Sequence, residues 1–424
     1  MTICGIDFGT SNSALAVVAD GNVQLVRVDE DSQTMPSAIF YHEDGTAVYG
    51  RGAIASFTSG DSGRFMRSFK RTLGTELLEY GAIINGKLKK YDQIIAGFIR
   101  HLKLRAESSL GIDLDNVVMG RPVHFVDNNT EADRCAQNQL EKIARLVGFK
   151  HIEFQFEPIA AAFAHEQKVI GEKITLVVDI GGGTSDFTII RLSEASVHKL
   201  DRKEDILSCV GGRVGGNDFD RDFCLRSFMP ILGYGTTYGT KGMEVPISPF
   251  FDMSEWSKIN SLYVPKVLKN LREIYIDSHS QKTFGRFVRA VEERAGHKVL
   301  STVESAKIDL TDKYEIQEKL EFLEDGLEII LTRDGFEQTI MHHIETIGKW
   351  IDNCLREASV AEEHIQLVIL TGGTTEIPLL QKIVKDRFPH ADISGSDKLS
   401  SVGLGLGYDG ARRFRSSLNS IVSI

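Results

Sequence analysis

Two stretches far apart in the chain each place an aspartate just before a glycine turn that also carries hydroxyl groups: Asp7 precedes residues 9–12, and Asp179 precedes residues 181–184. Glycine has no Cβ, so such a turn can adopt positive φ and its backbone N–H groups can approach a polyanion closely. The alternative is a plain hairpin turn that its aspartate caps. The candidate phosphate-binding residues are Gly9, Thr10, Ser11, Asn12, Gly181, Gly182, Gly183 and Thr184.

Short apolar strands must position these two turns. The β-branched run 174–179 is too short for a helix and predicts a buried strand, and residues 187–190 predict its antiparallel partner. Strands near 3–8, 13–19 and 23–28 predict a meander, with Asp20-Gly21-Asn22 as its second turn. A repeated strand, aspartate, turn and strand implies two similar half-domains that face one ligand, with Asp7 and Asp179 holding a hydrated Mg²⁺ between them.

Further glycine turns end other elements. Residues 211–220 predict a glycine loop that feeds a helix from about Asn217, whose first amides would point at an enclosed ligand. Strand 366–370 runs into another glycine turn, and a helix opening near Pro158 leaves Glu157 at its mouth. These segments add the candidates Gly215, Gly216, Asn217, Gly372, Gly373 and Thr374.

The rest of the chain alternates predicted helices and strands without low-complexity tracts. We expect a long loop over residues 233–254, which are rich in Gly, Tyr, Thr and Pro. Helices are predicted at 91–110, 131–147, near 258–277 and 286–308, at 334–357 and at about 399–415, with strands at 116–123, 151–156, 315–322 and 327–332.

Composition limits the possible classes of protein. With 424 residues, two or more domains are expected, and a formal net charge of −10 argues against nucleic-acid and membrane-surface partners. The five cysteines are scattered without Cys-x-x-Cys spacing, which suggests neither a disulfide framework nor a zinc site. The chain enters a strand without a leader and has no apolar run near the roughly 20 residues of a spanning helix, so we expect a cytoplasmic location.

Two common nucleotide motifs do not account for this chain. Residues 405–410 satisfy Gly-x-Gly-x-x-Gly, but no strand precedes them, so a dinucleotide site is not expected there. No Gly-x-x-x-x-Gly-Lys-Ser/Thr occurs, which argues against a P-loop enzyme.

Taken in order, the segments 5–13, 157–162, 179–184, 215–220 and 372–378 resemble the motifs of the actin-like ATPase superfamily. The resemblance covers about residues 2–410 and is nearest to the nucleotide-binding domain of DnaK-type chaperones, the heat-shock-70-like branch. It implies an α/β fold of two lobes, each built on a duplicated ribonuclease-H-like mixed sheet with flanking helices, with the nucleotide in the cleft between them. The expected divisions are lobe I at 1–170 with an inserted subdomain at about 37–115, lobe II at 171–398 with an elaborated insert at about 221–311, and at 399–424 a C-terminal helix that packs back on lobe I and a short tail.

The resemblance also implies roles for single residues. Lys70, within Lys70-Arg-Thr-Leu-Gly74, matches the catalytic lysine on the γ-phosphate; the alternative is a solvated surface lysine. Glu157 would orient or deprotonate the attacking water, with Thr184 as a second contact; the alternative is a carboxylate placed favourably at a helix N-terminus. The stretch 304–311 is similar to the adenosine-binding helix, whose i, i+3 spacing puts two side chains on one face; the alternative there is an exposed ion pair. Its candidate residues are Glu304, Lys307 and Thr311.

Several positions depart from the family pattern. Ile308 and Glu376 stand where the family brackets its adenine with two arginines, and Ile159 stands where a hydroxyl usually occurs. The region 221–303 looks longer than in the chaperones. The chain also ends without the acidic linker and peptide-binding β-sandwich of DnaK, so we expect no substrate-binding domain, as in the single-domain YegD-type relatives.

The sequence therefore predicts a Mg²⁺-dependent protein that binds ATP and ADP, hydrolyses ATP slowly and acts as a nucleotide-controlled, chaperone-like switch. We expect a monomer read by a protein partner or client, with no nucleic-acid or membrane partner. Three alternatives stay open: a sugar or small-molecule kinase of the same superfamily, an actin-like filament protein, and a nucleotide-binding module without hydrolysis.

Overall fold

The computed structural model describes residues 2–19, 22–199, 201–395 and 400–421. The predicted turn residues Asp20 and Gly21, the expected helix start at Leu399 and the last three residues of the tail lie outside this set. The chain forms two compact units. We call residues 1–215, 347–376 and 380–424 the main unit, and residues 216–346 with 377–379 the inserted unit.

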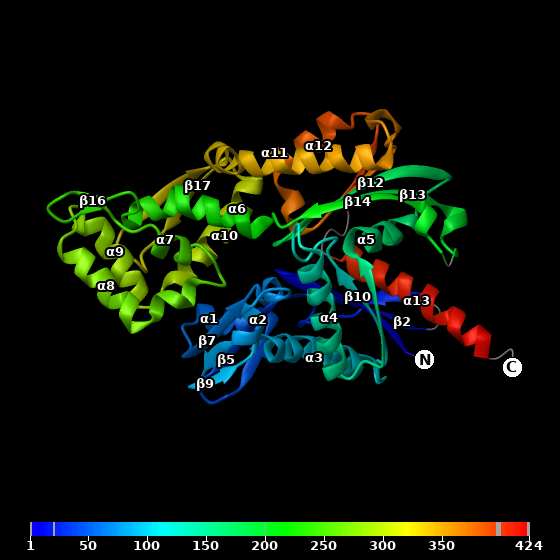
Figure 1. Ribbon diagram of the computed structural model, residues 1–424, viewed down its shortest axis with the longest axis horizontal. Helices are drawn as coiled ribbons and strands as arrows, with labels where there is room; N and C mark the ends of the chain where they lie inside the picture. Colours follow the sequence, from blue (N-terminus) through cyan, green and yellow to red (C-terminus); the bar gives the residue numbers. More distant parts are fainter. Residues whose placement is uncertain (1, 20–21, 200, 396–399, 422–424) are drawn as a thin grey trace. The chain divides into compact units, whose positions relative to one another are not determined.

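The main unit contains two sheets with the same strand arrangement (Figure 1). In each, three antiparallel neighbours are followed by two strands that pair in parallel. The first sheet has the order β3 (Asn22–Leu25), β2 (Asn12–Ala19), β1 (Ile3–Phe8), β10 (Asn116–Arg121) and β11 (His151–Phe156), with β4 (Thr34–Pro36) also on β2. The second has the order β14 (Ile206–Gly212), β13 (Ser185–Ser193), β12 (Glu172–Ile180), β19 (Leu367–Thr371) and β20 (Asp392–Ser394). The predicted duplicated mixed sheet is confirmed.

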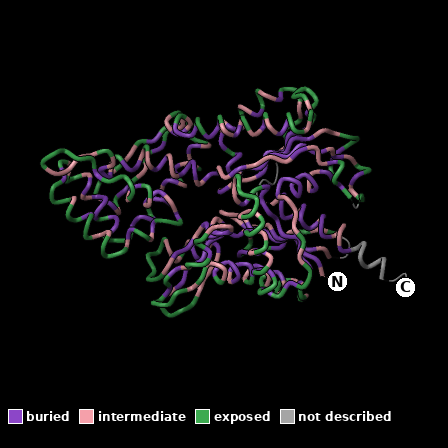
Figure 2. The backbone as a smooth tube through the Cα atoms, viewed as in Figure 1, coloured by how far each residue is buried: buried purple, intermediate pink, exposed green. Residues whose placement is uncertain are grey.

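Helices cover the first sheet and meet it through apolar side chains, so buried residues follow its strands (Figure 2). The predicted helices at 91–110 and 131–147 are confirmed as α3 (Tyr91–Leu110) and α4 (Thr130–Val147). Glycines at 111 and 148 end them in the left-handed conformation, and the Asn129 side chain caps the start of α4.

The segment between β4 and α3 holds small elements around a three-stranded sheet. The sheet joins β5 (Ala38–His42), β6 (Ala47–Tyr49) and β7 (Gly63–Arg67), with α1 (Gly50–Thr58) beside it. A 3₁₀ turn at Phe69–Thr72, the short α2 (Leu77–Tyr80) and the hairpin of β8 (Ala82–Ile84) and β9 (Lys87–Lys89) follow.

Two helices complete the main unit around the sheets. α13 (Ser401–Ile421) packs on α5 (Glu157–Glu166) and on β1, β2 and β10. Its Gly-x-Gly-x-x-Gly serves this packing, because a Cβ at Gly405 would overlap the Ala160 carbonyl and one at Gly407 would overlap Val23. α12 (Pro378–Arg387) follows β19.

The inserted unit is mainly helical: α6 (Gly216–Phe223), α7 (Ser248–Met253), α8 (Pro265–Ile276), α9 (Gln281–Glu292), α10 (Gly296–Asp312) and the first half of α11 (Arg333–Ala358). It also contains the hairpins β15 (Thr237–Tyr238) with β16 (Met243–Glu244) and β17 (Glu315–Lys319) with β18 (Glu328–Thr332).

The prediction of a long loop at residues 233–254 was wrong, because this segment contains β15, β16 and α7. Phe250 orders it by packing on Tyr234 and Phe287. The helices predicted near 258–277 and 286–308 are instead three, since Pro265 opens α8 and Arg294 adopts a left-handed φ of 53° before α10. Among the described residues, no helix is both long and apolar enough to cross a membrane.

Candidate functional site

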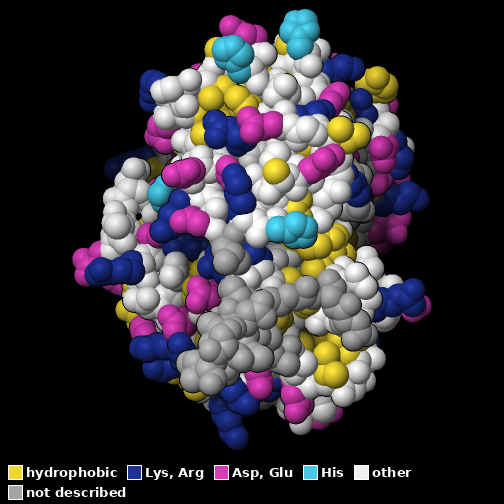
Figure 3. All heavy atoms as spheres, turned by 90° about the vertical axis from the view of Figure 1, so that its right-hand side faces the viewer, with side chains coloured by type: hydrophobic (Ala, Val, Ile, Leu, Met, Phe, Trp, Pro, Cys, Tyr) yellow, Lys and Arg dark blue, Asp and Glu magenta, His cyan; other side chains and the backbone are white. Residues whose placement is uncertain are grey.

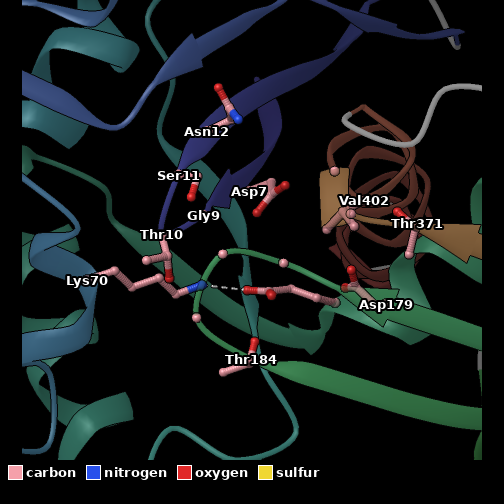
Figure 4. A pocket seen from close by; sticks show the side chains of 16 residues that line it. Asp7, Gly9, Thr10, Ser11, Asn12, Lys70, Asp179, Thr184, Thr371 and Val402 are labelled. Atoms are coloured by element: carbon pink, nitrogen blue, oxygen red, sulfur yellow. Dashed lines mark hydrogen bonds and ion pairs between the residues drawn. The ribbon is translucent and has the colours of Figure 1, made fainter. Parts of the chain in front are cut away.

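The two predicted turns line one cavity of the main unit, about 560 Å³ including the space that opens to solvent (Figure 4). Asp7 lies near the end of β1 and Asp179 near the end of β12, so equivalent strands of the two sheets each contribute one carboxylate. The lining residues are Asp7, Gly9, Thr10, Ser11, Asn12, Lys70, Glu157, Asp179, Gly181, Gly182, Gly183, Thr184, Thr371, Gly372, Gly373 and Val402.

Close contacts leave little room for a Cβ at two glycines at or beside this cavity, Gly183 and Gly215. A Cβ at Gly183 would lie 2.8 Å from Thr10 Oγ1, and one at Gly215 would lie 2.7 Å from the carbonyl carbon of Gly182, so three turns meet here. Residues 181–183 are all described and none has the positive φ that we considered. The turn closes instead through the Gly181 N–H, which donates to the Thr184 carbonyl at 3.0 Å.

The third strand-end turn belongs to the same cavity. Gly372 has a φ of +80°, and a Cβ there would lie 2.9 Å from the Asp179 carboxylate. The Thr374 hydroxyl donates to the Gly181 carbonyl at 3.0 Å. The turn after β19 is therefore fixed to the turn after β12, as expected for neighbouring parallel strands that end at one edge of a sheet.

Lys70 and Glu157, both predicted catalytic residues, form an ion pair of 2.8 Å, drawn as a dashed line in Figure 4. Their side chains are only 8% and 10% exposed. Lys70 comes from the 3₁₀ turn Phe69–Thr72, which Ser68 enters with a left-handed φ of 57°. Glu157 is the first residue of α5, where a proline follows it. Lys70 is therefore no solvated surface lysine.

Three further carboxyl groups lie near this pair, and all have raised pKa values. Burial raises the pKa of Asp7 to about 7, with repulsion from Glu157 adding to the rise and Lys70 opposing it. Burial and the charges of Glu157, Asp186 and Asp7 raise the pKa of Asp179 well above its ordinary value. Burial and Glu157 likewise raise the pKa of Asp186 to about 8. A divalent cation would favour the ionised form of these carboxyls, and an all-oxygen donor set suits a hard cation such as Mg²⁺.

Asp186 is a buried carboxyl next to the site that our sequence reasoning missed. It pairs directly across the hairpin from Asp179, and its Oδ1 accepts the Val123 N–H at 2.8 Å. This bond ties the second hairpin to the segment after β10. Hairpin register could have revealed it, since a strand pair that flanks a short turn places the residues at equal distances from the turn opposite each other.

Ser37 and Val402 were also missed. The Ser37 hydroxyl donates to the Gly9 carbonyl at 2.7 Å and lies 2.9 Å from the Ser13 hydroxyl, which braces the first turn. Val402 lines the cavity from the start of α13. No sequence motif marks either residue, because each lies far along the chain from the turns that it contacts or joins in the cavity.

The remaining candidates belong to the inserted unit, where Gly216 and Asn217 begin α6 and residues 304–311 lie on α10. Lys307 Nζ is 2.7 Å from Asp220 Oδ1, and the two side chains are 13% and 4% exposed. The Thr311 hydroxyl donates to the carbonyl of Ile308, whose own side chain is 55% exposed. A buried carboxylate on α6 thus forms an ion pair with Lys307.

Comparisons with known proteins identify the family of this chain. The family described as Hsp70 protein matches residues 3–229 and 275–406. The gap in the match, residues 230–274, falls within the stretch 221–303 that we expected to be longer than in the chaperones.

Two curated relatives have the same description. The chain is 26% identical over 415 residues to Chaperone protein DnaK of Elusimicrobium minutum (strain Pei191), covering 95% of this chain and 56% of that protein. It is 27% identical over 413 residues to Chaperone protein DnaK of Thermosipho africanus (strain TCF52B), covering 95% and 58%. The chain thus spans little more than half the length of these relatives. On the family match and the duplicated sheets, this chain belongs to the Hsp70 protein family and has the actin-like ATPase fold.

Proposed function

We propose that this protein is a Mg²⁺-dependent, chaperone-like switch that binds ATP and ADP and hydrolyses ATP slowly. The carrying observation is the cavity in which Asp7, Asp179, Lys70 and Glu157 meet two glycine turns from duplicated hairpins. The phosphates would lie against the backbone N–H groups of these turns, where a Cβ at Gly9 or Gly183 would meet a neighbouring atom within 3.0 Å.

Asp7 and Asp179 would hold the metal through water molecules, and the metal would offset the phosphate charge. Phosphoryl transfer depends mainly on positioning and charge neutralisation. When a phosphate enters, Lys70 would exchange Glu157 for a phosphate oxygen. This exchange would release Glu157, with Thr184 beside it, to orient or deprotonate water. The ion pair supports slow turnover, because hydrolysis would require its prior opening.

The nucleoside end of the ligand would involve Gly215, Gly216, Asn217, Gly372, Gly373, Thr374, Glu304, Lys307 and Thr311. We expect modest affinity for adenine, because Ile308 and Glu376 supply no guanidinium to stack on the base. Lys307 would contact a ribose hydroxyl only after loosening its bond to Asp220.

The wider proposal follows the family. The divisions at 1–170, 171–398 and 399–424 would act as two lobes and a returning helix, and ATP would favour their closed state. A protein partner or client would read the change, with the protein a monomer in the cytoplasm. Acidic and basic side chains are interspersed on the described part of the face in Figure 3, which with the net charge of −10 favours a protein partner over nucleic acid or membrane.

Mg²⁺-ATP turnover and nucleotide binding should be measured on the same samples of wild type, Lys70→Ala and Asp179→Asn. Lys87→Ala is a matched control, since this exposed lysine lies, like Lys70, in the segment between β4 and α3. We expect wild-type turnover on the order of 10⁻² s⁻¹, as for an unstimulated switch GTPase. Lys70→Ala should lose turnover yet bind nucleotide, Asp179→Asn should lose turnover, and Lys87→Ala should match wild type.

Other outcomes would select the alternatives. Sugar-stimulated turnover would indicate a small-molecule kinase, and ATP-dependent sedimentation would indicate a filament protein. Nucleotide binding without hydrolysis would indicate a module without turnover. If wild type binds no adenine nucleotide, the proposal fails.

A further inference from the structure

Three potential metal ligands converge in the inserted unit, on residues outside the nucleotide cavity. Asp222 lies near the end of α6, and His342 and His343 lie on α11. Asp222 Oδ2 is 2.8 Å from His343 Nε2 and 3.2 Å from His342 Nε2. One donor atom from each residue lies within 4.8 Å of the others.

The convergence is unusual for two neighbouring helix residues, because side chains at i and i+1 do not ordinarily face each other. Here the two imidazole rings lie 3.9 Å apart and direct the same type of nitrogen at one oxygen. His343 is buried and stacks on the Phe219 ring, with centroids 5.2 Å apart. His342 is 61% exposed. The cluster is therefore packed against the protein at His343 and open to solvent at His342.

The carboxylate is oriented from its other side. Arg221 Nε donates to Asp222 Oδ1 at 2.9 Å, which leaves Oδ2 for the histidines. Hydrogen-bonded partners of this kind commonly orient metal ligands.

We propose that Asp222 Oδ2, His342 Nε2 and His343 Nε2 form a binding site for a borderline divalent metal ion, with Zn²⁺ as the best fit. Metal–ligand bonds of about 2.0–2.2 Å in a tetrahedron put donors about 3.3–3.5 Å apart. The two nitrogen-to-oxygen distances, 2.8 and 3.2 Å, need only small side-chain movements to reach this spacing. Water would take the fourth position on the open side of His342. Two nitrogen ligands favour Zn²⁺, Co²⁺ or Ni²⁺ over Mg²⁺.

A metal at this place would fasten α6 to α11. α6 begins directly after Gly215, the glycine whose backbone meets the second phosphate turn. The site does not depend on the proposed nucleotide chemistry, because neither of its histidines nor Asp222 lines that cavity.

The test is Zn²⁺ binding by the full chain without a histidine tag, after EDTA treatment and without nucleotide. Zn²⁺ is followed by competition with a chromophoric chelator, and Co²⁺ by visible absorption, which reports tetrahedral coordination. His342→Ala is the main variant because the exposed ring can be removed without disturbing packing. Asp222→Asn is the second, and His364→Ala is the control, an exposed histidine in the main unit. Circular dichroism checks that each variant is folded.

We expect one Zn²⁺ per chain in wild type and in His364→Ala. Losing an outer partner of a metal ligand costs about 10–100-fold in affinity, so loss of a direct ligand in His342→Ala or Asp222→Asn should weaken binding at least tenfold and abolish the Co²⁺ bands. If wild type takes up no stoichiometric Zn²⁺, or if His342→Ala binds as tightly as wild type, the cluster is a hydrogen-bonded contact between two helices and the proposal is overturned.

Discussion

Replacing Asp186 by asparagine should remove a large part of the pH dependence of stability. The buried carboxyl has its pKa raised to about 8, whereas the same group in the unfolded chain ionises near its ordinary value of 3.8. Between pH 5 and pH 7 the native state therefore keeps a proton that the unfolded state has lost. Because the native state binds more protons, the free energy of unfolding falls as the pH rises through this window.

The magnitude follows from the width of the window. Each pH unit changes the free energy of unfolding by about 1.4 kcal/mol for one such group, so two units correspond to about 3 kcal/mol. Asp7 and Asp179 act in the same direction, since their pKa values are also raised. Asp186→Asn should therefore reduce the slope of the free energy of unfolding against pH by about 1.4 kcal/mol per pH unit, the contribution of one such group. The variant should match wild type only below pH 3.8, where the acid is protonated in both states, because the neutral amide has the shape of the protonated acid and can still accept the Val123 N–H. By pH 5 the variant should already be the more stable by about 1.6 kcal/mol.

The assay is urea unfolding at pH 5, 6 and 7 in EDTA without nucleotide. A Trp256→Phe background leaves Trp350 as the single tryptophan of the two in the chain. Its ring lies 6.2 Å from Phe187, so its fluorescence reports the sheet that contains Asp186.

The control for this assay is Asp44→Asn. Hydrogen bonds from Thr46 lower the pKa of this exposed carboxyl, so it is ionised throughout the window in both states. The slope of Asp44→Asn should equal that of wild type. Parallel pH profiles for wild type and Asp186→Asn would refute the reasoning from burial and repulsion.

Three further variants test particular contacts. Lys70→Ala should lower the free energy of unfolding by about 3–5 kcal/mol, because it leaves Glu157 charged and mostly buried without its partner; adding Glu157→Gln should restore much of the loss in urea unfolding, and no recovery would contradict the ion-pair argument. Gly212→Ala should cost about 1–3 kcal/mol and shift the emission of Trp350, whose ring an added Cβ would overlap, so unchanged emission counts against this close contact. Arg202→Met should lower the melting temperature through a loss of about 3–5 kcal/mol, since two buried carboxylates would lose their guanidinium, and a melting temperature equal to that of wild type would contradict this view.

The elements that carry the cavity could be predicted because their signals are local. Strand β12, its glycine turn and β13 follow one another within about twenty residues, and alternation with turn chemistry is enough to define such a hairpin. The ends of α3 and α4 were likewise marked by Gly111 and Gly148.

Partnerships over long separations could not be predicted. The ion pair of Lys70 with Glu157 joins residues 87 positions apart, and spacing along the chain does not encode which carboxylate a lysine meets. For the same reason the spacing that puts Lys307 and Glu304 on one helix face does not reveal the contact of Lys307 with Asp220 on another helix. The composition of residues 233–254 is typical of turns, so it did not predict the regular structure that Phe250 stabilises through ring packing.

The position of the inserted unit has a consequence for how the chain reaches its structure. β12 pairs in parallel with β19, and residues 216–346 are made between them. A ribosome-bound chain could thus complete the first sheet after residue 156 emerges, but the second would wait with one long side of β12 unpaired until residue 371 is free. Contacts of such high sequence separation form slowly, and unpaired strand edges are prone to aggregate. A protein placed in a chaperone family would itself pass through an intermediate of the kind that chaperones protect.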